Sequence, residues 1–204
     1  MAAAIFVLFS RGSASAVTAE EFYAGAQKIK NINAFAATVQ SAHETEFWTS
    51  FLWKNAMNGA GIKADKKWRA AGRPHILKKS PESVGGKIIY RESYFRVYKS
   101  LDEFLGDYGT KITRDYPLAV KHSGTAWGYF ASLQKGRLGS WATTKKYFEY
   151  MTSMAFRLAP KLLGPDWKEE LLEDFKEARR LGILSKQEMA LIEKKFSNIG
   201  VSVK

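Results

Sequence analysis

The sequence predicts a mainly α-helical (α+β) domain that carries one small β-hairpin and ends in a helical hairpin. Apolar residues recur at helical spacing from the first predicted helix onward, as in Phe22, Ala26 and Ile29. One strand–turn–strand pattern interrupts them, where Gly85 and Gly86 separate two candidate strands. The chain has 204 residues, 46% of them hydrophobic, so it is long enough to bury a core, and it contains no cysteine.

The predicted elements follow in chain order. Residues 19–50 are expected to be mostly helical, and residues 54–86, rich in Gly, Asn and Lys, to be irregular. The segment IIYRESYFRVY, residues 88–98, has the β-branched and aromatic composition of a strand. Ser100 and Glu103 have the spacing of a capping box at the start of the next helix. Further helices are expected over 116–132 and 143–158.

Pro160 and Gly164 predict a boundary near the C-terminus. Two helices are expected beyond it, one capped by Asp166 that runs to about residue 181, and one over 185–196 that opens with a capping box. This predicted helical hairpin contains no visible catalytic motif. The expected organisation is an N-terminal segment of residues 1–16, a main domain of residues 17–160 and a C-terminal helical extension of residues 161–204.

The N-terminus contains a short apolar run, residues 2–9, followed by Ala14-Ser15-Ala16, which fits a signal-peptidase site. No Lys or Arg precedes the run, so a buried N-terminal segment is the alternative. The run is too short to span a bilayer, and no other segment is predicted to be transmembrane.

The formal net charge of +12 and the sequence pI of about 9.7 predict a polyanionic partner. Most of the positive excess lies before residue 161. Nucleic acid is not the expected partner, because the sequence contains neither a Lys/Arg-rich run nor a known binding module. An anionic cell-wall polymer fits the charge better, and the oligomeric state is left open.

Several chemistries are excluded by the motifs. The three histidines, His43, His75 and His122, form no metal-spaced pair, so we expect no metal and no cofactor. There is no nucleophile elbow, P-loop or dinucleotide-binding fingerprint. What remains is carboxylates among aromatics, which is typical of glycoside hydrolases.

Cleavage of a glycosidic bond needs a carboxylic acid that stays protonated, and a partly apolar setting raises its pKa. A second carboxylate must activate water or stabilise the cationic sugar. Aromatic rings offer flat faces to sugar C–H groups. The candidate rings are Trp48, Trp53, Trp68, Tyr94 and Trp127.

Four motifs in order carry a resemblance to a known family. They are SAHET (residues 41–45), NGAGIK (58–63), ESVGGK (82–87) and FRVY (95–98), with Asp107 after them. This series resembles the glucosaminidase domain of glycoside hydrolase family 73, whose usual motifs are AxxESGWG, NLFGIK, ExxxGK and FRxY. The resemblance covers about residues 20–155 and implies a lysozyme-like fold in which the hairpin forms a wing beside the groove, with residues 17–160 as the catalytic domain.

The resemblance also assigns roles to residues. Glu44 matches the catalytic acid at the end of its helix, and Glu82 matches a second glutamate on the hairpin. The matched positions expected to contact the substrate are Asp107, Tyr116, Trp48, Asn58 and Tyr98. Whether the mechanism is inverting, retaining or assisted by the substrate's N-acetyl group is left open.

The sequence departs from the family pattern at two motifs. Thr45-Glu46-Phe47-Trp48 replaces SGWG and lacks both glycines, and NGAG replaces NLFG. Glu46 is the rival of Glu44 as the acid, and periodicity alone does not separate them. The simpler alternatives are a solvated Glu82, an Asp107 that only pairs with a basic residue, and a core His43.

The implied function is an endo-β-N-acetylglucosaminidase that cleaves the GlcNAc-β-1,4-MurNAc bond of peptidoglycan at the bacterial cell wall. One alternative is a muramidase or lytic transglycosylase on the same fold. A second is an inactive wall-binding or phage-assembly module. The compact, basic chain favours a phage lysin over a bacterial autolysin.

Overall fold

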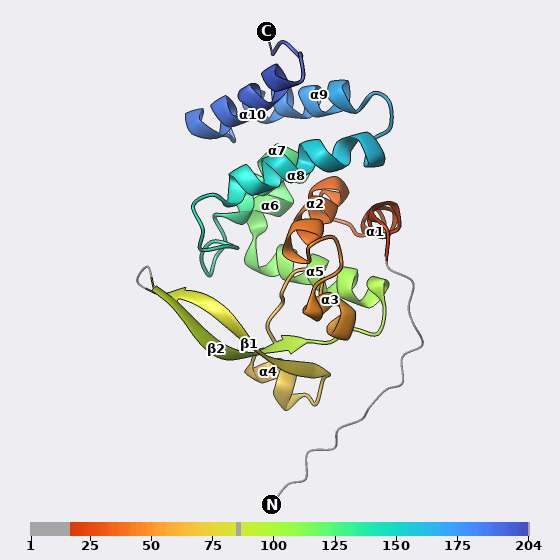
Figure 1. Cartoon of the computed structure of the whole chain (residues 1–204), viewed down its shortest axis with the longest axis vertical. Helices are drawn as coiled ribbons and strands as arrows, with labels where there is room; N and C mark the ends of the chain where they lie inside the picture. The colour runs from red at the N-terminus through yellow and green to blue at the C-terminus, as the bar shows by residue number, and fades with distance from the viewer. Residues whose placement is uncertain (1–16, 85–86, 204) are drawn as a thin grey trace, which may run out of the picture.

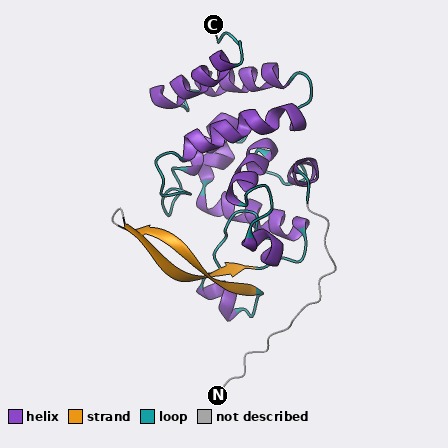
Figure 2. Ribbon diagram, in the orientation of Figure 1, coloured by secondary structure: helices purple, strands orange, loops and turns teal. Residues whose placement is uncertain are grey.

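The computed structural model describes residues 17–84 and 87–203, with the backbone alone over 80–84 and 87–88 (Figure 1). The predicted N-terminal segment and the two turn glycines lie outside these residues. A helical body carries a two-stranded hairpin that projects from one side (Figure 2), which confirms the predicted class. The elements are α1 (Ala19–Ala26), α2 (Ala34–Glu44), α3 (Phe51–Ala56), α4 (Lys66–Ala70), β1 (His75–Val84), β2 (Lys87–Arg96), α5 (Leu101–Asp115), α6 (Pro117–Lys121), α7 (Ala126–Leu133), α8 (Tyr147–Leu162), α9 (Trp167–Arg180) and α10 (Lys186–Asn198).

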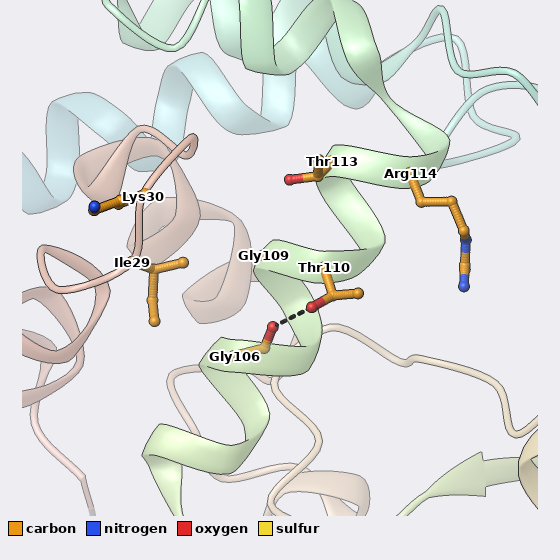
Figure 3. Close-up of a pocket in the computed structure, with 7 residues that line it drawn as sticks. All are labelled: Ile29, Lys30, Gly106, Gly109, Thr110, Thr113 and Arg114. Atoms are coloured by element: carbon orange, nitrogen blue, oxygen red, sulfur yellow. Dashed lines mark hydrogen bonds between the residues drawn. The ribbon is translucent and has the colours of Figure 1, made fainter.

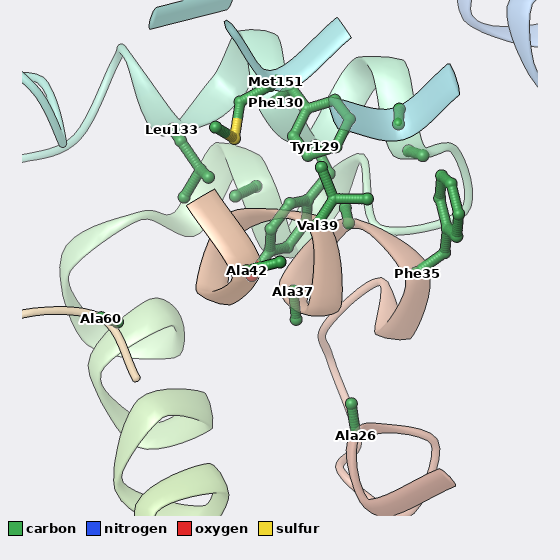
Figure 4. Packing of buried hydrophobic residues seen from close by; sticks show 14 of the residues in the cluster. Ala26, Phe35, Ala37, Val39, Ala42, Ala60, Tyr129, Phe130, Leu133 and Met151 are labelled. Atoms are coloured by element: carbon green, nitrogen blue, oxygen red, sulfur yellow. The ribbon is translucent and has the colours of Figure 1, made fainter. Parts of the chain in front are cut away.

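The helix α2 lies at the centre of the body. Asn33 caps it by accepting a hydrogen bond from the backbone N–H of Ala36 at 2.8 Å. All residues from 35 to 42 are buried, against side chains of α7 and α8 such as Phe130 and Met151 (Figure 4). Because close-packed interiors permit little displacement, this burial fixes where the C-terminal end of α2 lies.

A left-handed turn follows α2 directly. Glu46, Phe47 and Trp48 have φ angles of 51°, 56° and 59°, a region that costs residues other than glycine about 1–2 kcal/mol each. Trp48 anchors the turn: its indole N–H donates to Ser41 Oγ at 3.0 Å, and its backbone N–H donates to Thr45 Oγ1 at 2.9 Å. In the family that the sequence resembles, glycines stand at the positions of Glu46 and Trp48. Glycine adopts this backbone without strain, whereas in this chain packing holds it.

The hairpin pairs β1 with β2 in antiparallel register from His75–Arg96 to Val84–Lys87. The prediction that residues 54–86 are irregular was therefore wrong over β1 and α4. A strand before Gly85 is predicted, but its start at His75 is not, because HILKKSPESV lacks a clear apolar alternation and its pairing with β2 decides its structure. At the base of the wing, Phe95 is buried, and a bridge between Phe95 and Lys63 joins the hairpin to the segment before α4.

The helical regions are more divided than predicted. The region 19–50 splits between α1 and α2, because Asn31 has a φ of 67° and Asn33 caps a new helix. The region 116–132 splits likewise, where the Thr125 side chain caps α7. Pro160 does not mark the boundary, because it lies inside α8, which continues to Leu162.

The C-terminal helices α9 and α10 pack on α7 and α8, and Phe175 and Phe196 belong to the same hydrophobic cluster as the rest of the body. The capping box of Ser185 with Glu188 is present, but the Asp166 side chain makes no capping bond. Among the described residues, no helix combines the length and apolar character that crossing a bilayer requires.

Asp174 joins this hairpin to the body. From α9, its carboxylate accepts hydrogen bonds from the first backbone N–H groups of α7, Ala126 at 2.7 Å and Trp127 at 3.2 Å. Burial raises the pKa of Asp174 to about 6, and these two hydrogen bonds oppose the rise.

The strained turn generates a prediction. Replacing Glu46 with glycine should increase the free energy of unfolding by about 0.5–1 kcal/mol, because glycine adopts positive φ without strain although it gains more freedom when unfolded. Chemical denaturation checks this. Glu46→Ala is the control, since it removes the same carboxylate and keeps the strain; equal effects of the two substitutions would contradict the explanation.

Asp174 generates a second prediction. The folded chain keeps this proton up to about pH 6, whereas the unfolded carboxyl, with a pKa of 3.8, releases it earlier. The free energy of unfolding should therefore fall as the pH rises from about 4 to about 6, by up to about 2 kcal/mol from this group. Denaturation across that range should show a smaller fall for Asp174→Asn. Glu173→Gln, at a neighbouring exposed carboxylate, should keep the wild-type slope, and an unchanged slope in Asp174→Asn would refute the assignment.

Candidate active site

Glu44 is the last residue of α2. One carboxylate oxygen, Oε1, accepts a hydrogen bond from the indole Nε1–H of Trp141 at 3.1 Å. The residue is open to solvent on one side, yet the protein around its carboxyl raises its pKa, and the bond from Trp141 partly opposes the rise. The result is a carboxylic acid that reaches solvent and still holds its proton to higher pH than an ordinary glutamate.

Trp141 reaches Glu44 from the loop between α7 and α8. Its backbone N–H donates to the carbonyl of Leu133 at 2.9 Å, and its ring lies 5.3 Å from the ring of Tyr116 and 6.1 Å from that of Tyr108. The residue is partly buried, so its ring forms a wall beside the carboxyl. The sequence pattern did not single out this residue, because a lone tryptophan in a Gly-, Ser- and Thr-rich loop has no periodicity and belongs to none of the four motifs.

A tyrosine cluster lies behind Glu44. Gln40, on α2, donates to the hydroxyl of Tyr147 at 2.8 Å and accepts from the hydroxyl of Tyr108, which lies 2.9 Å from that of Tyr129. Burial raises the pKa of all three tyrosines, and the nearby charge of Glu44 adds to the rise at Tyr108 and Tyr147. They stay neutral, so they provide a rigid polar backing without a competing charge.

The predicted Tyr116 lies on the same side of the molecule as Glu44, against Trp141. It is 7% exposed, and burial raises its pKa to about 12. Lys111 on α5 places its ammonium 5.7 Å from both the Tyr116 and Trp141 rings while it pairs with Asp115 at 2.9 Å. A fixed positive charge therefore borders these two rings.

Asp107 is engaged in an ion pair. Both of its oxygens accept from Arg96 Nη1 at 2.8 Å, and Oδ2 also accepts from the hydroxyl of Tyr98 at 2.6 Å. The Arg96 guanidinium in turn lies 4.2 Å from the ring of Trp68. This arrangement ties β2 to α5 and agrees with the simpler alternative, in which Asp107 pairs with a basic residue. A substrate contact by Asp107 stays a prediction.

Three other predicted substrate contacts are covered. Trp48 and Tyr98 are 4% and 0% exposed, and their rings pack in the core. Asn58 is also 0% exposed; it closes the loop 58–62 through Ile62 and bonds the carbonyl of Arg96 at 3.0 Å. Their burial gives them a structural role behind the site instead of the direct contact that was expected.

The two remaining carboxylates differ in what the structure describes. Glu82 lies on β1, paired with Ile89, but its side chain is outside the described residues. Glu46, the rival acid, is exposed in the left-handed turn, and its backbone carbonyl accepts from Thr49 at 2.6 Å. The contact with Trp141 and the raised pKa favour Glu44 over Glu46.

His43 precedes the acid and is half-buried. Its ring stacks on that of Tyr150 at 5.4 Å, and burial lowers its pKa, so it is mostly neutral near pH 7. No group of three His, Asp or Glu side chains among the described residues could hold a metal ion.

A shallow depression of about 440 Å³ lies on another face, between α5 and the loop after α1 (Figure 3). It contains no carboxylate. Its lining residues are Ile29, Lys30, Gly106, Gly109, Thr110, Thr113 and Arg114. Acid catalysis is not expected there, so the surface around Glu44 is the candidate site.

A helical body with a hairpin wing, and a glutamate of raised pKa at the end of a buried helix, is the arrangement of a glycoside hydrolase. A model of the glucosaminidase family, described as mannosyl-glycoprotein endo-beta-N-acetylglucosaminidase, matches residues 20–159. The chain belongs to this family. A search of curated protein sequences gave no match.

Solved structures share the fold. The C-terminally truncated glycoside hydrolase domain of FlgJ from Salmonella typhimurium is 25% identical, with a TM-score of 0.50 over 69% of this chain and 97% of that one. The catalytic domain of the autolysin Auto from Listeria monocytogenes is 21% identical, with a TM-score of 0.55 over 71% and 86%. A mutant peptidoglycan hydrolase from Sphingomonas sp. A1 is 21% identical, with a TM-score of 0.56 over 76% and 96%.

The bond between Trp141 and Glu44 generates a prediction that needs no activity. Trp141→Phe removes an N–H that stabilises the charged carboxylate, so the pKa of Glu44 should rise further. A carbon-13 NMR titration of labelled glutamate carboxyls, with the Glu44 signal assigned from Glu44→Gln, measures this. Trp167→Phe, at a tryptophan on α9, should leave the titration unchanged. A fall in the Glu44 pKa in Trp141→Phe would contradict the hydrogen bond.

Proposed function

We propose that the chain is a peptidoglycan hydrolase of the endo-β-N-acetylglucosaminidase type, which cleaves the GlcNAc-β-1,4-MurNAc bond with Glu44 as its acid. The observation that carries the proposal is the Glu44 carboxyl, held by Trp141 at the end of a buried helix with its pKa raised. The family match supports the bond type. The likeness to a FlgJ glycoside hydrolase domain supports a glycan substrate, and the strongly basic chain supports an anionic one.

In the proposed reaction, Glu44 donates its proton to the glycosidic oxygen as the bond from that oxygen to C1 of GlcNAc breaks. The leaving sugar takes the proton as a hydroxyl, and positive charge develops on the GlcNAc ring. The raised pKa keeps the proton on Glu44 before the step, and the indole N–H of Trp141 stabilises the carboxylate after it.

Glu82 is proposed as the second carboxylate, which activates water or stabilises the cationic ring. Its place on the hairpin supports this, because strand alternation sets position 82 on the same face as positions 76 and 78. At position 78, the Lys78 ammonium lies 5.6 Å from the ring of Phe51 on α3, so this face contacts the helical body at that point. The wing would therefore hold the Glu82 carboxylate opposite the helical body.

The basic surface supports action at the bacterial cell wall, in the periplasm or outside the cell. One cationic side chain, Lys111, lies beside the Tyr116 and Trp141 rings, and the chain as a whole carries a formal net charge of +12. Such charges would raise the encounter rate with anionic wall polymers and make it salt-dependent.

The test is digestion of purified peptidoglycan with identification of the new reducing ends by mass spectrometry. Wild type should release fragments that end in reducing GlcNAc, and Glu44→Gln should lower the rate by at least about 100-fold, because it removes the proton donor. Glu46→Gln is the matched control and should keep most activity.

Other products would contradict the proposed bond specificity and favour one of the alternatives. Reducing MurNAc ends would indicate a muramidase, and anhydro-MurNAc ends a lytic transglycosylase. Wall binding without any cleavage by the wild type would favour an inactive wall-binding or assembly module.

A further inference from the structure

The strand face of the wing that lies opposite Ile76 and Lys78 is unusually aromatic. Leu77 and Tyr94 are direct partners across the hairpin, and His75 contacts Tyr94 with ring centroids 5.4 Å apart. Tyr90 lies four residues before Tyr94 on the same strand face, about 13 Å from it. Arg69 of α4 covers the patch at its base, with its guanidinium 4.4 Å from the Tyr94 ring. We call Arg69, His75, Leu77, Tyr90 and Tyr94 the outer-wing patch.

The side chains of this patch are largely open to solvent. Tyr90, Leu77 and Tyr94 are 65%, 46% and 37% exposed, although the same hairpin buries Phe95 on its opposite face. Exposed apolar patches mark interaction surfaces on soluble proteins. Leu77 and Tyr94 form such a pair, and Tyr90 lies farther along the same strand face. Because positions 76, 78 and 82 lie on the opposite strand face, the outer-wing patch is separate from the proposed catalytic groove.

The charge around the patch selects an anionic partner. Arg69 carries a positive charge at the base of the patch, with its guanidinium beside the Tyr94 ring. Arg73 and Lys79 extend the positive charge on either side, against one carboxylate on the same face, Glu92, which is paired in register with Lys79. Exposed tyrosines suit the C–H faces of sugars, and a guanidinium suits a carboxylate.

We propose that the outer-wing patch binds a second peptidoglycan strand, with Tyr90 and Tyr94 against sugar rings and Arg69 on a carboxylate of the lactyl or peptide substituents. This inference rests on the proposed function, which makes peptidoglycan the substrate. The patch would hold the enzyme on the neighbouring strand of the mesh while the groove around Glu44 acts on another. It would therefore raise affinity for the intact wall and leave cleavage of short soluble fragments unchanged.

The experiment measures two quantities for each variant. One is sedimentation with purified peptidoglycan sacculi, in a Glu44→Gln background that prevents digestion. The other is the rate of cleavage of short soluble peptidoglycan oligosaccharides in the wild-type background. The patch variants are Tyr90→Ala, Tyr90→Ala with Tyr94→Ala, and Arg69→Gln. Lys186→Gln and Leu181→Ser, on the C-terminal helices, are the controls for loss of one positive charge and of one exposed leucine.

The double tyrosine variant should bind sacculi about fivefold more weakly, and Arg69→Gln about threefold, with soluble cleavage and both controls at wild-type level. Tyr90→Ala, at the most exposed ring, keeps the test valid if the double variant misfolds. Unchanged sacculus binding in the patch variants, with wild-type cleavage intact, would overturn this inference alone. An equal loss of soluble cleavage would also overturn it, by making the patch part of the groove.

Vesicles of phosphatidylglycerol and phosphatidylcholine test an anionic lipid surface as the alternative partner of the patch. Patch-dependent binding to vesicles with sacculus binding unaffected would overturn the proposal in favour of lipid. A wild-type protein that neither cleaves nor binds sacculi would refute the proposed function itself. It would also refute peptidoglycan as the partner of the outer-wing patch.

Discussion

The burial of α2 is the constraint on which the rest of the structure depends. Eight successive residues of this helix are buried, so α1, α7 and α8 pack around it and the position of its last residue is fixed. That last residue is Glu44. A carboxyl at the end of such a helix has protein on one side and solvent on the other. The same geometry raises the pKa of Glu44 and leaves the carboxyl accessible, which are the two properties that a general acid needs.

Strain is concentrated directly after the acid. Three successive residues adopt positive φ, and the burial of Trp48 together with its bond to Ser41 holds them there. The chain thus keeps the backbone path that glycines would favour at positions 46 and 48. Loss of those glycines does not by itself remove the turn, because tertiary packing supplies the free energy that opposes the local strain.

Electrostatic roles are divided among distinct groups around the site. Buried tyrosines behind Glu44 stay neutral and bond to one another through Gln40, so they add rigidity without adding charge. Charged pairs lie farther out, where Arg96 with Asp107 ties the wing to α5 and Asp115 pairs with Arg114 and Lys111. Arg96 and Tyr98 both bond to Asp107, which holds the hairpin that carries Glu82 against α5.

The sequence by itself determined the fold class, the hairpin, the family and the candidate acid, because these depend on local periodicity, turn chemistry and short motifs in a fixed order. Its periodicity did not separate Glu44 from Glu46, and the motif match alone chose Glu44. The sequence did not find Trp141, because a contact between residues 97 positions apart leaves no local pattern. It assigned Trp48, Asn58 and Tyr98 to the substrate, whereas the structure buries them. Only the tertiary structure decided which aromatic rings form the core and which, like Trp141 and Tyr90, reach the surface, since burial is a property of packing between distant segments.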